Sequence, residues 1–268
     1  MARVSNALNS LAETKLKASG LLAHKRELHI EILTAENMEG LGLAARGGLL
    51  LPYHDAQGRR TPFFRVRYLE DPPPNSWGFK DKKPQRYAQP AGTVNEVYLA
   101  PIVPWAALLA DPQFPLVITE GELKAACACA QDIATIGLGG VWNFRAAKHG
   151  LPLLPQLEAI SWQGREVYIC FDSDAVTNSN VAAAEACLCR VLSMQGAKAK
   201  IIRLPSLFDG AKTGLDDWLM AQDDPRGAFE KLMSTGEELD RLTAELHGMN
   251  SELIVIKKPG CVMTQDGK

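Results

Sequence analysis

The feature that most constrains the fold of this chain is a regular alternation of apolar runs and amphipathic stretches between residues 115 and 220. The apolar runs are continuous, which indicates strands buried on both faces, and the stretches between them carry apolar residues at helical spacing. Strands joined in strict order by helices are typical of a parallel sheet in an α/β domain. The expected strands are 116–119, 134–137, 167–171 and 199–205, and the expected helices are 122–131, 153–160 and 180–196.

The rest of the chain predicts three further parts around an α/β domain at 113–225. Residues 1–46 carry leucines at helical spacing and predict a helical N-terminal segment. Residues 47–112 predict a smaller α+β domain, in which a basic hairpin with Arg65 and Arg67 on one face precedes a long loop rich in proline and lysine. Residues 226–268 predict a C-terminal helix and the start of a truncated hairpin, which suggests an expression boundary or a longer natural protein.

The composition is that of an ordinary globular protein, with 46% of the 268 residues hydrophobic and 22% charged. No apolar run approaches the roughly 20 residues of a membrane helix, and the N-terminus lacks the apolar core of a secretory signal. We therefore expect a cytoplasmic protein without a membrane partner. The six cysteines form no C-x-x-C pair, so we expect buried reduced thiols and no zinc.

The net charge of −2 does not by itself indicate a protein that binds nucleic acid. The basic residues are unevenly distributed, however, because residues 59–86 contain eight basic side chains and three acidic ones. This segment is the candidate surface for a nucleic-acid partner.

Carboxylates follow the expected strands with a regularity that composition does not require. Glu120 follows the first strand, Asp172 and Asp174 follow the third, and Asp216 and Asp217 come after the last. Functional groups of parallel sheets lie outside the carboxyl ends of the strands. Because alternate residues of an extended chain point the same way, we expect Asp172 and Asp174 to lie together beside Glu120.

A cluster of like charges in one cleft is unfavourable unless a cation neutralises it. Hard oxygen ligands favour Mg²⁺ or Mn²⁺, and two such ions a few ångströms apart are the usual arrangement for in-line phosphoryl transfer. The alternative for a single acid such as Asp172 is a helix cap. The expected catalytic and metal-binding residues are Glu120, Asp172 and Asp174, with Glu122, Asp216 and Asp217 as further candidate ligands.

Glycines cluster at the end of the second expected strand, in ATIGLGG. They allow a backbone to approach a phosphate closely, although a tight turn is the commoner reason for such glycines. The chain has no G-x-x-x-x-G-K-[ST] loop and no recognisable nucleophile elbow, which excludes an ATPase motor and argues against serine or cysteine hydrolases. The glycines expected to approach phosphate are Gly121, Gly139 and Gly140.

The order VITEG, ATIGLGG and ICFDSDA resembles the Toprim domain, the metal-binding fold shared by bacterial-type primases, type IA and II topoisomerases and certain nucleases. The resemblance covers roughly residues 115–220. It implies that Glu120 is the glutamate proposed as general acid or base, and that Asp172 and Asp174 are the metal-binding Asp-x-Asp pair. Bacterial primases commonly carry a further acid four residues after the glutamate, where this chain has Lys124.

Over a longer stretch, GGLLLPYHDAQG, KPQRYAQPAG and KTGLDDWL resemble the primase-like Toprim proteins of phages, plasmids and integrated elements. In those proteins an N-terminal part with a basic surface precedes the Toprim domain, and a helicase part often follows. The resemblance implies single-stranded DNA, nucleoside triphosphates and a helicase domain or partner. The residues expected to bind nucleic acid or nucleotide are Arg65, Arg67, Lys82, Lys83, Arg86, Lys124 and Lys212.

The leading hypothesis is a DNA primase of mobile-element replication, a metal-dependent nucleotidyl transferase. The first alternative is a Toprim nuclease, in which the same metal site activates water. The second is a non-catalytic DNA-binding Toprim module attached to a helicase, which the presence of Lys124 keeps open. Trp77 and Trp142 are candidates for stacking on bases, although packing in the core or in a loop is the commoner role.

Overall fold

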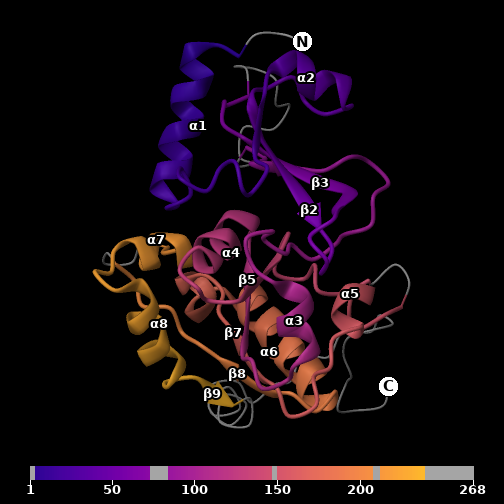
Figure 1. Cartoon of the computed structure of the whole chain (residues 1–268), viewed down its shortest axis with the longest axis vertical. Coiled ribbons are helices and arrows are strands. Elements are labelled where there is room, and N and C mark those ends of the chain that lie inside the picture. Colours follow the sequence, from indigo (N-terminus) through magenta and orange to yellow (C-terminus); the bar gives the residue numbers. More distant parts are fainter. Residues whose placement is uncertain (1–3, 73–83, 147–149, 208–211, 239–268) are drawn as a thin grey trace.

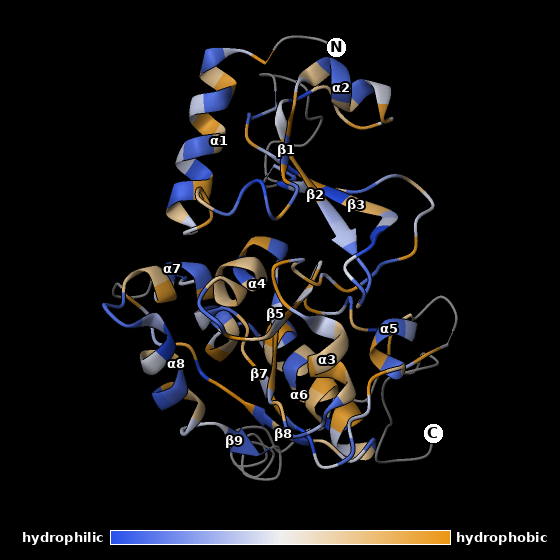
Figure 2. Ribbon diagram, in the orientation of Figure 1, coloured by the Kyte–Doolittle hydropathy of each residue, from blue (hydrophilic) through white to orange (hydrophobic). Residues whose placement is uncertain are grey.

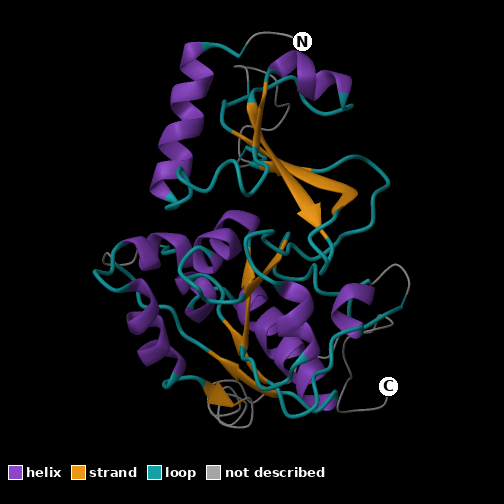
Figure 3. Cartoon of the chain, in the orientation of Figure 1, coloured by secondary structure: helices purple, strands orange, loops and turns teal. Residues whose placement is uncertain are grey.

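The computed structural model describes residues 4–72, 84–146, 150–207 and 212–238, which form two sheets with helices around them (Figure 1, Figure 3). Three features considered above lie outside the described residues: the C-terminal hairpin, the loop residues Trp77, Lys82 and Lys83, and Cys261. Within the described part of the chain, no helix is both long and apolar enough to span a membrane.

The first sheet is antiparallel and has the strand order β1-β2-β3-β4. Its centre is the predicted hairpin of β2 (Gly48–His54) and β3 (Arg60–Tyr68). Asp55 closes the turn by accepting hydrogen bonds from two backbone N–H groups, and Gly58 has a φ of 74°, which glycine adopts without steric cost. The hairpin prediction is confirmed.

Two short strands of this sheet differ from the prediction. β1 (Glu31–Leu33) pairs with β2 and lies within residues 1–46, where the sequence predicts only helix. β4 (Tyr87–Ala88) pairs with β3 and lies in the stretch predicted to be a loop. Strands of two or three residues are too short to show an alternating pattern, and they form because the edges of the hairpin offer unpaired backbone groups.

Two helices accompany the first sheet. α1 (Asn6–Ala18) begins where the Ser5 hydroxyl accepts a hydrogen bond from the backbone of Leu8, and it packs against β1 and β2. α2 (Ala35–Gly40) begins at a Thr34 cap of the same kind. The helical prediction for residues 1–46 is therefore confirmed only at α1 and α2, which have 13 and 6 residues, and most of residues 19–29 between them form turns.

The second sheet has the order β6-β5-β7-β8-β9, and its first three pairings are parallel. This confirms the predicted α/β domain, and it places β5 beside β7 although helices and a strand separate them in sequence. The edge strand β9 is antiparallel and was not predicted. The strands are β5 (Leu116–Glu120), β6 (Thr135–Leu138), β7 (Glu166–Ile169), β8 (Lys198–Ile201) and β9 (Glu237–Glu238).

Helices connect these strands and pack against them. α4 (Glu122–Cys129) packs on β6 and on α7 (Leu215–Met220), and α6 (Ser179–Met194) packs on β8. The side of α6 that faces the sheet carries the apolar residues Val181, Leu188 and Leu192. The remaining helices are α3 (Trp105–Ala110), α5 (Pro155–Glu158), α8 (Pro225–Met233) and the short 3₁₀ helix η2 (Ser173–Val176).

One hydrophobic core joins the two sheets. It includes Tyr53 and Phe63 from the first sheet together with Leu116, Ile118 and Leu188 from the α/β part. Figure 2 shows apolar residues concentrated in β5 and in α3 and α4 around it. The residue ranges that the sequence divides into separate parts therefore share a common interior.

Candidate active site

Glu120 and Asp172 come from neighbouring strands of the parallel sheet. Glu120 is the last residue of β5, and Asp172 lies just after β7 at the start of η2. Since β5 and β7 are adjacent and parallel, their carboxyl ends meet at one edge. The Asp172 side chain is 5% exposed and that of Glu120 is 30% exposed, so the pair lies partly enclosed at the predicted place.

Lys124 links these two carboxylates. Its Nζ lies 3.1 Å from Glu120 Oε2 and 2.5 Å from Asp172 Oδ1. Gly121 makes this possible, because its φ of 111° lets the chain turn from β5 directly into α4. Burial alone lowers the pKa of Lys124, but the charges of Glu120 and Asp172 outweigh burial and raise the pKa. Lys124 is therefore a permanent positive charge between two acids.

Lys212 forms a second bridge, between Asp172 and Asp174. Its Nζ lies 2.9 Å from Asp172 Oδ2 and 3.0 Å from Asp174 Oδ2, and its side chain is 53% exposed. Partial burial lowers the pKa of Lys212, but the hydrogen bond and charge of Asp172, with those of Asp174, raise it overall. Within the described part of the chain, Asp174 Oδ1 is buried and has no hydrogen-bond partner.

The two acids of α7 differ from each other. Asp216 is buried and accepts a 2.6 Å hydrogen bond from the hydroxyl of Ser19, while Lys15 Nζ lies 3.6 Å away. Asp217 is exposed and accepts a 3.1 Å hydrogen bond from the backbone N–H of Gly214, which caps α7. The segment around α1 thus reaches the site through Asp216, and Asp217 has a structural role at the helix end.

Glu122 points away from the other acids. It is fully buried, and its Oε1 accepts a 2.7 Å hydrogen bond from the Tyr53 hydroxyl and another of 2.7 Å from Arg65. Residues two apart on a helix face different sides, so Glu122 and Lys124 serve different neighbours. Glu122 and Arg65 therefore form an internal ion pair between α4 and the first sheet and do not belong to the acid cluster around Asp172.

A cleft of about 460 Å³ lies between the acid cluster and the first sheet. Four of the basic residues predicted to bind nucleic acid or nucleotide line it: Arg67 and Arg86 from the first sheet and its flank, and Lys124 and Lys212 beside the acids. The guanidinium carbons of Arg65 and Arg67 both lie over the ring of Tyr87, at 5.1 and 5.2 Å from its centroid. The other charged lining residues are Lys15, Glu120, Asp172, Asp216 and Asp217.

The three glycines predicted to approach phosphate have separate roles. Gly121 lines the cleft and begins α4. Gly139 makes room for Arg65, because a Cβ at that position would lie 2.6 Å from Arg65 Nη1. Gly140 lies beside the side chain of Asn143, where a Cβ would be 3.4 Å from the amide nitrogen.

Three cleft or support residues were not identified from the sequence. Lys15 and Ser19 lie in the N-terminal part, far from the acid motifs along the chain, and nothing in their local sequence marks them. Tyr87 stands next to Arg86 in QRYAQ, where an aromatic residue among basic ones is a usable signal for a nucleotide site.

The carboxylates of the cleft are already paired with ammonium groups. Across the described residues, no three His, Cys, Asp or Glu side chains are grouped in a way that would hold a metal ion. Lys124 and Lys212 stand between the acids instead. A divalent cation would bind here only where one of these lysines can move away.

The fold around this cleft is a mixed α/β fold with a parallel sheet, and it resembles the folds of solved DnaG primase catalytic cores. A solved DnaG primase catalytic domain bound to single-stranded DNA has a TM-score of 0.53 and 17% identity, with 87% of this chain and 76% of that chain covered. The DnaG catalytic core has a TM-score of 0.57 and 16% identity, with 90% and 77% covered. The Aquifex aeolicus primase, with its zinc-binding and RNA polymerase domains, has a TM-score of 0.50 and 15% identity, with 93% and 54% covered.

Sequence comparisons give a more limited likeness. A family model described as a domain of unknown function (DUF3854) matches residues 104–225. An uncharacterized protein of Picosynechococcus sp. (strain ATCC 27264 / PCC 7002 / PR-6) is 29% identical over 173 residues. That match covers 53% of this chain and 17% of the relative, so the matched stretch is a small part of a much longer relative.

Proposed function

We propose that the chain is a metal-dependent nucleotidyl transferase that makes primers on single-stranded DNA, a DNA primase. The observation that carries the proposal is the composition of the cleft. Carboxylates from two strand ends form one side of it, and Arg67 and Arg86 line it from the first sheet. Phosphoryl transfer needs both a site for a cation and positive groups for phosphates. The likeness to a primase catalytic domain bound to single-stranded DNA supports the choice of substrate.

Mg²⁺ or Mn²⁺ would be held by Asp172 and Asp174. The donors fit, because both are carboxylates and Asp174 Oδ1 is buried without a hydrogen-bond partner in the described structure. Lys212 bridges the two acids, but its side chain is 53% exposed and has room to turn toward solvent or a phosphate. When bound, the ion would neutralise charge on the phosphates.

Lys124 occupies a more enclosed position than Lys212, with 19% of its side chain exposed. We assign its ammonium the role that a second cation has in two-metal sites, since it already lies between Glu120 and Asp172. Glu120 remains 30% exposed toward the cleft and is the carboxylate that would accept the proton of the attacking 3′-hydroxyl.

The DNA strand and the nucleoside triphosphate would meet the basic residues of the cleft. Arg67, Arg86 and Lys15 would contact phosphates, so binding would weaken with salt and depend little on sequence. A helicase domain or partner, and a role in the replication of a phage, plasmid or integrated element, complete the proposal. These two points rest on the resemblance of the sequence motifs.

A non-catalytic DNA-binding module is the second candidate. The two lysine bridges favour it, because they neutralise the acids without a metal ion. A nuclease would use the same acids, with water in place of the 3′-hydroxyl.

The test is primer synthesis by the full chain from labelled ribonucleotides on single-stranded DNA, with Mg²⁺ or Mn²⁺. The wild type should make labelled products and Asp172→Asn should make none. Asp223→Asn, at an exposed acid outside the cleft, should match the wild type. Shortened template in place of new product would identify a nuclease. Binding of the strand with neither labelled product nor shortened template would identify a binding module. Either of these two results would reject the primase.

A further inference from the structure

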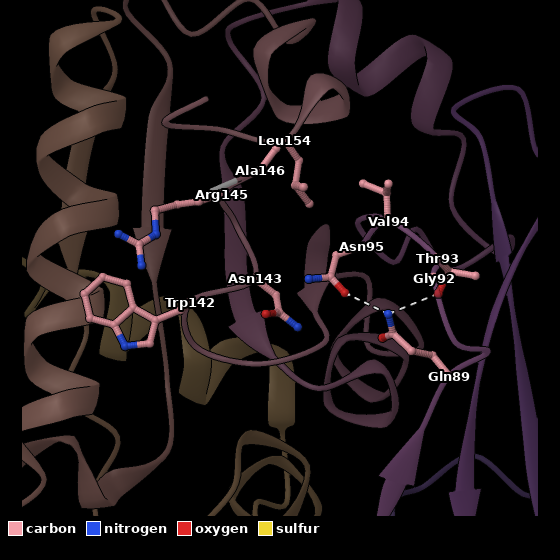
Figure 4. Close-up of a pocket in the computed structure, with 10 residues that line it drawn as sticks. All are labelled: Gln89, Gly92, Thr93, Val94, Asn95, Trp142, Asn143, Arg145, Ala146 and Leu154. Atoms are coloured by element: carbon pink, nitrogen blue, oxygen red, sulfur yellow. Dashed lines mark hydrogen bonds between the residues drawn. The ribbon is translucent and has the colours of Figure 1, made fainter. Parts of the chain in front are cut away.

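A second cavity, of about 600 Å³, lies beside the segment that follows Tyr87 of the cleft in the chain (Figure 4). Its walls come from two parts of the chain, residues 89–95 after β4, and residues 142–146 together with Leu154 after β6. The cavity and the cleft are lined by residues that are near neighbours in the chain. Tyr87 lines the cleft and Gln89 lines the cavity, and two residues of chain span at most about 7 Å.

Trp142 is held in a fixed orientation at one side of this cavity. Its Nε1 donates a 2.9 Å hydrogen bond to Asn180 Oδ1, at the start of α6. The guanidinium carbon of Arg145 lies 4.2 Å from the centroid of the indole ring. The indole is half-buried, and its one donor is already used. Arg145 lies over one face of the ring, so the interaction that the indole still offers is stacking through its other face.

Amide side chains form the opposite side. Gln89 Nε2 donates hydrogen bonds to Thr93 Oγ1 at 3.2 Å and to Asn95 Oδ1 at 3.1 Å. Asn95 accepts through its oxygen, and Figure 4 shows its amide nitrogen directed into the space toward Asn143. None of the described lining residues is acidic. Amides supply a donor and an acceptor side by side, which is what the edge of a nucleobase requires.

We infer that this cavity binds a nucleobase, which stacks on Trp142 and presents its edge to Asn95 and Asn143. The inference rests on the proposed function, because the cleft next to it supplies the nucleotide whose base enters. The base can belong to a DNA strand or to a free nucleoside triphosphate. In either case the guanidinium of Arg145, which lies over one face of the indole, is a nearby positive group suited to the accompanying phosphate.

The test measures binding by the full chain to a labelled single-stranded oligodeoxynucleotide and to the same strand built from abasic sites. Trp142→Ala should weaken binding of the normal strand about tenfold, which is the usual effect of losing one stacked base. The affinity for the abasic strand should not change. Trp142→Phe keeps an aromatic surface and should restore most of the affinity. Phe114→Ala removes an exposed aromatic side chain outside the cavity and should leave both affinities unchanged.

A second arm replaces the strand by ATP. If Trp142→Ala loses about tenfold in affinity for ATP and none in affinity for the strand, the cavity binds the base of a free nucleotide, which also supports the inference. Equal losses for the normal and abasic strands, no loss for any ligand, or no measurable binding by the wild type would overturn it. Failure of the proposed function is read separately, as absent primer synthesis, because base-dependent binding should persist in Asp172→Asn.

Discussion

Replacing Lys124 by methionine tests the proposed role of its ammonium directly. The substitution keeps the length and the apolar stem of the side chain and removes its charge. Glu120 and Asp172 then face each other without the cation that now lies 3.1 and 2.5 Å from them, while Lys212 remains on the other oxygen of Asp172.

The structure sets the expected loss of stability. Removing one partner of a fully buried ion pair costs about 3–5 kcal/mol. Here Glu120 is 30% exposed and Asp172 keeps Lys212, so we expect a loss of about 2 kcal/mol in the free energy of unfolding. The measurement is urea unfolding in the presence of a chelator. Lys231→Met, at an exposed lysine of α8, is the control and should change stability by less than about 0.5 kcal/mol.

Divalent cations provide the second half of this test. A cation that takes the place of the ammonium in Lys124→Met binds only the folded state, and at a hundred times its Kd it adds about 2.7 kcal/mol. Mn²⁺ should therefore stabilise the variant more than the wild type. The proposed role of the Lys124 ammonium would be wrong if the variant were as stable as the wild type without cations, or if Mn²⁺ stabilised both proteins equally.

Three further predictions concern buried polar groups. Burial raises the pKa of Glu185 to about 7, so between pH 4.5 and 7 the folded state keeps a proton that the unfolded state has lost, and stability falls as pH rises. Glu185→Gln should therefore be more stable than the wild type at pH 8 by about 1–3 kcal/mol and equal to it near pH 4, by chemical denaturation at both pH values. Arg65→Met leaves Glu122 buried without a cation and should cost about 3 kcal/mol in urea unfolding; a loss below about 1 kcal/mol would show that the pair does not stabilise the fold. Ser19→Ala removes the donor to buried Asp216 and should cost about 1–2 kcal/mol, and an unchanged unfolding midpoint would contradict that contact.

The parallel sheet could be predicted from the sequence because its strands are continuous apolar runs. Each run, such as the one that becomes β5, is long enough to show burial on both faces. Strands β1, β4 and β9 contain only two or three residues, and their formation depends on the neighbouring strand edge. No pattern within such a short segment reports on a partner elsewhere in the chain.

The strand-end acids could be predicted because sheet topology fixes their place. Glu120 and Asp172 lie together as that argument requires. The side toward which the Glu122 side chain points could not be predicted in this way, because it depends on its partner Arg65, which is 57 residues earlier in the chain. The bridging by Lys124 likewise depends on where α4 starts and how it packs. Pairings of this kind are set by tertiary packing, which local sequence does not encode.

The attachment of the first sheet to the α/β part has a consequence for access to the cleft. Buried polar contacts that join the parts near the site include the ion pair of Arg65 with Glu122 and the hydrogen bonds of Tyr53 with Glu122 and of Ser19 with Asp216. A hinge that opened the cleft would have to break these contacts and to divide the hydrophobic core that the two sheets share. Ligands of the proposed site would therefore enter a preformed opening, and the ammonium of Lys212, whose side chain is 53% exposed, is the group that would have to move to admit a cation.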